Sequence, residues 1–168
     1  MQKSVPFELL DDEDGSIAVG WAGDSVIYAM VEGGLSAPLG TRYAEHVASL
    51  VRGLTGVHYF ADLALMTRYD LLARSAFVRM ALANRRCFDS FTFLMWQEGV
   101  SPAARAFAEA IGDNVTMCTV LGEFERRLLR AAPLARQRLS PQSWERFESA
   151  TGGIPEPALK VAGRRRSR

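Results

Sequence analysis

From residue 57 onward the chain alternates between short apolar runs typical of strands and longer segments whose apolar residues recur at helical spacing. The predicted strands are 57–63, 91–96 and 115–121, and the predicted helices are about 68–85, 101–112 and 122–132. Strands and helices that alternate with short links are typical of a parallel or mixed sheet with right-handed crossovers. The run at 91–96 is apolar without alternation, which indicates a central strand covered on both faces. The pattern predicts an α/β domain.

The residues before this alternation read as strands joined by turns. Asp14-Gly15 is a strong hairpin signal and Gly23-Asp24 a weaker one. The glycine-rich segment 32–40 is predicted to link the last of these strands to a helix, whose apolar residues are Ala44, Val47, Leu50, Val51 and Leu54. Gly53 or Gly56 would end this helix. We therefore predict one domain over residues 1–134, with N-terminal hairpin strands followed by strand–helix repeats.

Residues 135–168 differ in character and are predicted to form a C-terminal extension. The segment 140–149 could form a short helix whose Trp144 and Phe147 pack onto the domain or onto a partner. Residues 152–168 have the composition of a flexible tail and end in GRRRSR. Four arginines at a terminus would give only weak, salt-sensitive binding to nucleic acid, so a solubilising role is the preferred interpretation.

Composition limits the classes of partner. The formal net charge is +1, which gives no overall attraction to nucleic acid or to anionic membranes. The sequence contains no apolar run of the roughly 18 residues that a membrane span requires, and its first residues lack the features of a secretion signal. Cys87 and Cys118 stand alone, as free thiols in a reducing compartment do. We expect a cytoplasmic protein that binds neither nucleic acid nor membrane.

The residue types that carry chemistry show no catalytic or metal-binding pattern. His46 and His58 have no second ligand at metal-binding spacing. The glycine-rich segment lacks the lysine of a phosphate-binding loop, and Ser101 is better explained as a helix cap. The acidic residues Glu8, Asp11, Asp12, Glu13 and Asp14 are expected to form a solvated face. We therefore predict no metal, no cofactor and no enzymatic activity.

The join between the strand at 57–63 and the following helix is the most distinctive segment. Thr67-Arg68-Tyr69-Asp70 fits the capping pattern Ser/Thr-x-x-acid, in which Thr67 would cap the helix and Asp70 would bond back to the Thr67 amide. Asp70 and Arg74 are four residues apart and would form a favourable ion pair on the helix surface. A purely structural role can explain the motif.

The order of elements, together with Asp62-Leu63 and Met66-Thr67-Arg68-Tyr69-Asp70, resembles the STAS domain of bacterial anti-anti-sigma factors, and within it the divergent STAS-like branch. The resemblance covers about residues 16–132. It implies a STAS-like mixed sheet and a regulatory protein partner, such as a kinase-like regulator. In the typical family a serine at the start of this helix is phosphorylated. Here Thr67 is the nearest hydroxyl group, and the serine and glycine of the family motif are absent.

Three functional hypotheses follow. The first is a non-enzymatic interaction module of a signalling switch, whose surface would be the 63–74 join and the loop 97–101; its candidate residues are Asp62, Met66, Thr67, Arg68, Tyr69, Asp70 and Arg74. The second is a carrier of a small ligand or lipid, held in a pocket between apolar helix faces. The third is an enzyme, for which the sequence offers no assembled site. A homodimer through an edge strand or the Trp144 helix also stays open.

Overall fold

A six-stranded mixed sheet organises the molecule, and its strands lie side by side in chain order. The computed structural model describes residues 7–95 and 102–135. The strands are β1 (Glu8–Asp11), β2 (Gly15–Trp21), β3 (Val26–Leu35), β4 (Val57–Tyr69), β5 (Phe88–Leu94) and β6 (Val115–Cys118). The pairs β1–β2 and β2–β3 are antiparallel, and β3, β4, β5 and β6 run parallel to one another. The predicted α/β class and the N-terminal hairpins are confirmed.

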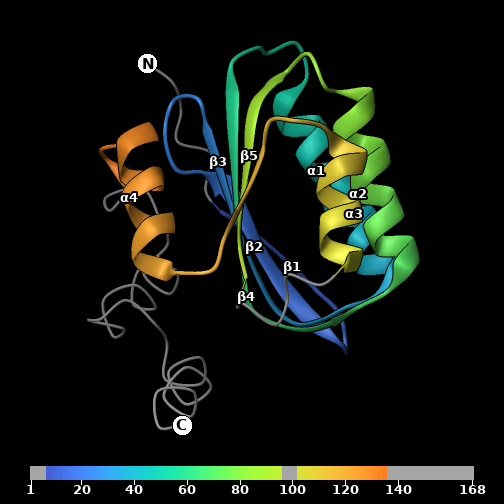
Figure 1. Cartoon of the computed structure of the whole chain (residues 1–168). Helices are drawn as coiled ribbons and strands as arrows, with labels where there is room; N and C mark the ends of the chain where they lie inside the picture. The colour runs from blue at the N-terminus through green and yellow to red at the C-terminus, as the bar shows by residue number, and fades with distance from the viewer. Residues whose placement is uncertain (1–6, 96–101, 136–168) are drawn as a thin grey trace, which may run out of the picture.

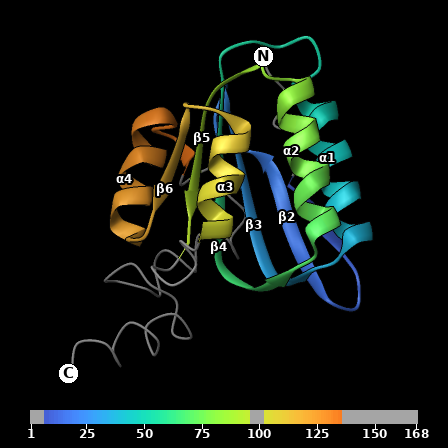
Figure 2. The same ribbon diagram turned by 45° about the vertical axis from the view of Figure 1, so that its right-hand side comes forward.

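Helices cover both faces of this sheet. They are α1 (Ala37–Val51), α2 (Leu71–Ala83), α3 (Pro102–Ile111) and α4 (Leu121–Ala131). Figures 1 and 2 show α1, α2 and α3 together on one face and α4 on the other. We call these the three-helix face and the α4 face. No helix in the described ranges is long and apolar enough to cross a membrane.

Several predicted boundaries are wrong. Strand β4 continues to Tyr69 instead of ending at residue 63, and α2 begins at Leu71 instead of at residue 68. Most of the predicted glycine-rich link is the end of β3, which runs to Leu35. The predicted strand 115–121 is shorter, because β6 ends at Cys118. The predicted loop surface at 97–101, the Ser101 cap, the Trp144 helix and the basic tail lie outside the described residues.

The turn between β1 and β2 is tied to the start of α1. Asp12 Oδ1 accepts hydrogen bonds from the backbone N–H groups of Asp14 (2.9 Å) and Gly15 (3.1 Å). Its other oxygen accepts from the Ser36 hydroxyl (2.5 Å), and Ser36 in turn caps α1 by accepting from the Leu39 N–H (3.1 Å). The hydrogen bond from Ser36 is the main cause that lowers the pKa of Asp12. The other four acidic residues of the predicted solvated face are exposed as expected, whereas Asp12 is half-buried and has a structural role.

Two cores result from the alternation of side chains along the strands. On the three-helix face, Tyr59 and Phe77 lie within an aromatic cluster with ring centroids 5.4 Å apart. On the α4 face, Phe60 packs edge-on against Phe124 at 5.6 Å. Every residue from Phe91 to Leu94 of β5 is buried, which confirms the prediction of a strand covered on both sides.

The helices α1 and α2 approach each other closely at Gly40. A Cβ atom added to Gly40 would lie 2.3 Å from the Cβ of Ala73, a distance that real side chains do not adopt. The missing side chain at residue 40 therefore allows the close approach of α1 to α2. Ala73 itself faces the cavity described below.

Candidate functional site

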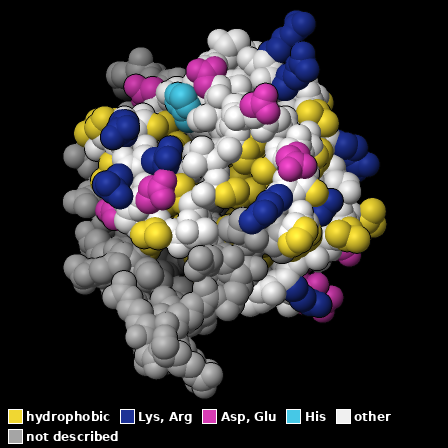
Figure 3. Space-filling model, in the orientation of Figure 1, with side chains coloured by type: hydrophobic (Ala, Val, Ile, Leu, Met, Phe, Trp, Pro, Cys, Tyr) yellow, Lys and Arg dark blue, Asp and Glu magenta, His cyan; other side chains and the backbone are white. Residues whose placement is uncertain are grey.

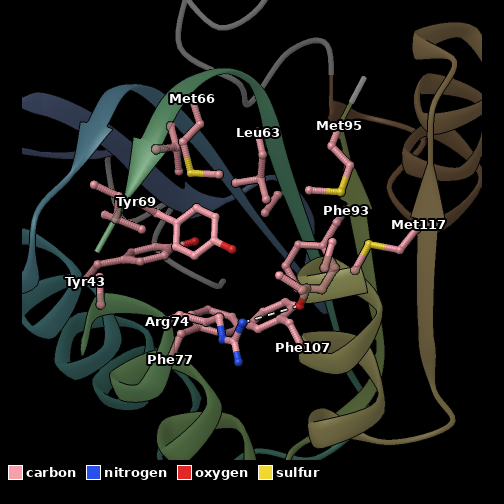
Figure 4. A pocket seen from close by; sticks show the side chains of 16 residues that line it. Tyr43, Leu63, Met66, Tyr69, Arg74, Phe77, Phe93, Met95, Phe107 and Met117 are labelled. Atoms are coloured by element: carbon pink, nitrogen blue, oxygen red, sulfur yellow. Dashed lines mark hydrogen bonds between the residues drawn. The ribbon is translucent and has the colours of Figure 1, made fainter. Parts of the chain in front are cut away.

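A cavity lies between the three helices and the sheet, at the carboxyl ends of the parallel strands (Figure 4). Ligands of open α/β sheets usually bind at this end of the strands. Sixteen residues line the cavity, and those with the largest side chains are Tyr43, Leu63, Met66, Tyr69, Arg74, Phe77, Phe93, Met95, Phe107 and Met117. Among the sixteen there is no acid, histidine, cysteine, serine or lysine, and Arg74 carries the single charge.

Two irregularities in β4 place its side chains on the cavity. In the pairing with β3, β4 contains one extra residue between Asp62 and Leu65, because three steps in β4 match two steps in β3. It contains a second extra residue between Met66 and Arg68, where two steps in β4 match one in β3. Each extra residue is a β-bulge, which reverses the side of the sheet to which the following side chains point. Leu63, Met66 and Tyr69 consequently all line the cavity, although residues of a regular strand point the same way only at every second position.

Asp62 stabilises the first of these bulges. It is one of the two buried polar residues in the described part of the chain and is 2% exposed. Its Oδ1 accepts a hydrogen bond of 2.9 Å from the backbone N–H of Ala64, inside the bulged segment. It does not line the cavity. Asp62, which was predicted as a site residue, therefore stabilises the bulged conformation of β4.

Thr67 does not cap the helix, and the prediction of a capping box from Thr67 to Asp70 is wrong. Thr67 lies in β4 with its side chain exposed, and the N-cap of α2 is Asp70, whose Oδ1 accepts from the Leu72 N–H at 2.7 Å. The Asp70 N–H donates to the Leu35 carbonyl at 2.8 Å, so the strand ladder ends where the helix begins. Arg68 forms an ion pair with Asp14 at the surface.

Arg74 does not pair with Asp70, contrary to the prediction. No described carboxylate lies within ion-pair distance of its guanidinium group, and Nη1 donates a long hydrogen bond of 3.4 Å to the carbonyl oxygen of Ala103 in α3. Asp70 uses its carboxylate to cap the helix instead. Arg74 is half-buried at the wall of the cavity, between α2 and α3.

The predicted site residues therefore divide into three groups. Met66, Tyr69 and Arg74 line the cavity, and Asp62 is buried beneath the bulge. Thr67, Arg68 and Asp70 lie on the outer surface. Beside them Leu71 and Leu72 are 66% and 67% exposed, so the start of α2 carries apolar side chains at the surface. Figure 3 shows hydrophobic side chains reaching the surface on the side that α1, α2 and α3 cover.

Tyr43 of α1 is the main functional candidate that the sequence did not reveal. Its side chain is 4% exposed and stacks on Phe77 with ring centroids 5.7 Å apart. Its hydroxyl group has no hydrogen-bond partner in the described structure, and Figure 4 shows it directed into the cavity. Burial raises the pKa of Tyr43, so the hydroxyl remains protonated and is available as a donor. In the sequence, such a tyrosine beside the apolar stripe of a helix cannot be distinguished from an ordinary core residue.

The described residues outside the cavity offer little other chemistry. No group of three or more histidine, cysteine, aspartate or glutamate side chains could hold a metal ion in the described ranges. His58 Nδ1 and the Ser90 hydroxyl are 2.9 Å apart, at the start of β4 and β5, and neither lines the cavity. His46 lies 3.2 Å from Glu8 at the edge of the sheet.

Comparison with known proteins identifies the fold. No protein-family model and no curated protein matches the chain. Among solved structures, it resembles an uncharacterized protein of the DUF3478 family from Shewanella loihica PV-4, which has a SpoIIAA-like fold. The TM-score is 0.56 and the sequence identity 14%, and the match covers 70% of this chain and 98% of that protein. The chain therefore has a SpoIIAA-like, that is STAS-like, fold.

Proposed function

We propose that this STAS-like domain is a non-enzymatic binding module that holds a small, predominantly apolar molecule in the cavity between the sheet and α1, α2 and α3. The observation that carries the proposal is the cavity itself. Protein interiors are normally packed as densely as organic crystals. A hollow lined by aromatic, methionine and aliphatic side chains is the usual form of a ligand site.

The size of the cavity limits the ligand. Its volume is about 90 Å³. A site for a single water molecule needs roughly 10–15 Å³, so the cavity has room for several water-sized atoms. The enclosed part of the ligand is therefore small, of the size of a phenyl ring or a short alkyl chain.

The lining favours binding over catalysis. Acid–base or nucleophilic chemistry usually needs a carboxylate, imidazole, thiol or amine, or a hydroxyl activated by a neighbouring base, held against the reacting atoms. The cavity offers only tyrosine hydroxyls and one guanidinium group, which bind and orient well but seldom start a reaction. The module would act by taking up or releasing its ligand.

A pair of alanine substitutions on α3 tests this proposal. Ala103 lines the cavity, whereas Ala106 is exposed on the same helix and does not. Ala103→Leu should fill the cavity and remove any small molecule that copurifies with the protein in native mass spectrometry, while Ala106→Leu should retain it. If wild-type protein carries no ligand and shows no thermal shift with a panel of small apolar compounds, the proposal is wrong.

A second candidate function is protein binding at the start of α2, within a regulatory switch. The observation in its favour is the apolar group Tyr69, Leu71 and Leu72, which are 38%, 66% and 67% exposed beside the charged Arg68. Exposed aromatic and aliphatic side chains rimmed by polar groups are common at protein interfaces. Phosphorylation of Thr67 would not act at a helix N-terminus, because α2 begins four residues later, at Leu71.

Capture of binding proteins from the native host tests this second function. The double variant Leu71→Glu, Leu72→Glu should lose a partner that wild-type protein retains, and Thr67→Glu should lose the same partner if the surface extends onto β4. Leu82→Glu is the matched control, because Leu82 is exposed (46%) near the other end of α2. A partner list that is the same for all four proteins would contradict an interface at this surface.

A further inference from the structure

We infer that the ligand of the cavity is an amphipathic carboxylate, whose head accepts hydrogen bonds from Arg74 and Tyr43 and whose apolar body lies among the aromatic and methionine side chains. This inference rests on the proposed function and specifies the chemistry of its ligand. It follows from two polar groups at the cavity that have no adequate partners among the described residues, 7–95 and 102–135.

The first of these groups is the Arg74 guanidinium. A buried or half-buried charge is costly unless a counter-charge and hydrogen bonds satisfy it. Arg74 has up to five N–H donors, yet within the described residues its one hydrogen bond is the long contact to the Ala103 carbonyl, and it forms no ion pair. An anionic group in the cavity would supply both the missing charge and the missing acceptors.

The second group is the Tyr43 hydroxyl. A buried hydroxyl without a hydrogen bond is unfavourable, and such groups in native proteins call for an explanation. Tyr43 is 96% buried and its hydroxyl is directed into the cavity, where a ligand oxygen could accept its proton in a hydrogen bond. Since α1 supplies Tyr43 and α2 supplies Arg74, two adjacent helices present donors to the same space.

A carboxylate fits these donors better than a phosphate does. Carboxylate is a planar monoanion whose two oxygens match one guanidinium group in a bidentate pair. A phosphate monoester carries up to two negative charges and three acceptor oxygens, which call for further cations. Arg74 is the only charged residue among the sixteen that line the cavity, and no second cation meets that demand.

The rest of the lining suits an apolar body attached to this head. Phe77, Phe93 and Phe107 form one wall, with ring centroids 5.3 Å apart for the pair Phe93 and Phe107. Met66, Met95 and Met117 contribute flexible and polarizable side chains that adapt to a bound molecule. Tyr69, which is 38% exposed, stands where the cavity meets solvent and offers a further hydroxyl.

Three probes of equal chain length separate the contribution of the head from that of the body. Binding of octanoate, octanol and octyl phosphate to the full chain is measured by isothermal titration calorimetry after any copurified molecule has been removed. Octanoate should bind about tenfold or more tightly than octanol, because hydrogen bonds to a charged group are worth more than those to a neutral one. Octyl phosphate should bind more weakly than octanoate.

Substitutions of Arg74 and Tyr43 then test whether these two residues bind the carboxylate head. Arg74→Met should weaken octanoate binding about tenfold to a hundredfold and leave octanol binding nearly unchanged. Tyr43→Phe should weaken octanoate binding severalfold. Arg79→Met is the matched control for the charge, because Arg79 is exposed on the same helix, and Tyr59→Phe is the control for a buried hydroxyl without a partner away from the cavity. Both controls should bind octanoate as wild type does.

The possible failures are distinguishable. If octanol binds as tightly as octanoate, or if Arg74→Met weakens both equally, the carboxylate inference is overturned and the cavity remains a ligand site. If octyl phosphate binds most tightly, the head is a phosphate and the inference is also overturned. If no probe binds to wild type and Ala103→Leu behaves as wild type, the proposed function itself fails. Should Arg74→Met not fold, the wild-type ratio of octanoate to octanol affinity still decides.

Discussion

The two faces of the sheet are packed to different degrees. On the α4 face, Phe124 and Leu128 are completely buried and fill the space above Phe60. On the three-helix face, a larger set of aromatic residues surrounds a cavity, and a tyrosine hydroxyl and a guanidinium group lie at its wall. The described residues of α4 thus pack closely against the sheet, whereas the three helices of the other face leave a cavity against it.

This difference shows how a small domain can separate stability from binding. Tight packing contributes most of the free energy of folding, and each missing contact reduces it. A protein can tolerate a hollow on one face if the other face and the sheet supply enough stability, and sites that bind ligands are commonly less stable than the rest of a fold. Four predictions test this division between the two faces.

The largest difference should appear when a phenylalanine is removed from each face. Phe124→Ala should lower the free energy of unfolding by about 3–5 kcal/mol, because the substitution opens a cavity in a filled core. Phe107→Ala should cost less, about 1–3 kcal/mol, because Phe107 already borders empty space on one side. Urea unfolding of both variants measures the two values, and equal losses would contradict the difference in packing.

Replacing an alanine by the larger leucine should change the free energy of unfolding in opposite directions on the two faces. Ala22 is completely buried in the α4-face core, so Ala22→Leu should destabilise the protein by about 1–3 kcal/mol through overpacking. Ala103→Leu should instead fill the cavity and raise the free energy of unfolding by about 0.5–2 kcal/mol. Thermal unfolding of the ligand-free proteins distinguishes the two. A loss of stability in Ala103→Leu would mean that the cavity is smaller than described.

A smaller effect is expected from Tyr43 and Tyr59 on the three-helix face, whose hydroxyls have no partner among the described residues. Tyr59 is completely buried in the packed part of that core and does not line the cavity, so Tyr59→Phe should raise the free energy of unfolding by about 1 kcal/mol. Tyr43→Phe should give a similar gain in the ligand-free protein, because the Tyr43 hydroxyl is also buried and has no partner among the described residues. Urea unfolding without ligand measures both gains, and a gain for Tyr59→Phe alone would show that water in the cavity already satisfies the Tyr43 hydroxyl.

The smallest effect should come from Asp12, which lies in the turn outside both packed faces. Because hydrogen bonds, chiefly from Ser36, lower the pKa of Asp12 in the folded state, the carboxylate stabilises the fold above the ordinary aspartate pKa of about 3.9. This stabilisation is lost as the pH falls through the lowered pKa. The difference in stability between wild type and Asp12→Asn should therefore shrink as the pH falls below about 4. A difference that is constant with pH would exclude a role for the charge.

The sequence allowed the order of strands and helices to be predicted because each element carries its own signal. The hairpin signals at Asp14-Gly15 and Gly23-Asp24 and the unbroken apolar run in β5 correspond to features of the structure. These signals are local in the chain. The STAS-like fold could accordingly be recognised from their order, and the solved structure from Shewanella loihica supports that assignment of the fold.

The end of β4 could not be predicted, because two bulges interrupt the regular alternation of side chains that marks a strand. Leu63, Met66 and Tyr69 recur every three residues and face one side, as residues on one face of a helix do. The bulges depend on the pairing with β3, which lies more than 25 residues earlier in the chain, so no local pattern indicates them. The apparent capping box at Thr67 had the same cause, since Asp70 itself is the cap.

A pocket between apolar helix faces was one of the hypotheses from the sequence, but only three of the residues that line the cavity were predicted as site residues. Met66, Tyr69 and Arg74 were selected because they belong to the join, and the structure places them at the cavity. Tyr43, Phe107 and Met117 lie on three further elements, and only the three-dimensional packing brings them together. The size of a cavity depends on how separate elements pack, and local sequence patterns carry no information about that packing.

The contact between Gly40 and Ala73 has a consequence for how such a domain could acquire new ligands. Gly40 sets the spacing of α1 and α2 but does not line the cavity, so it controls the width of the cavity without contacting the ligand. A change to alanine there would push the two helices apart and enlarge the space between Tyr43 and Arg74, while every residue in contact with the ligand stayed the same. Related domains could therefore differ in ligand size through a position that a comparison of cavity linings would overlook.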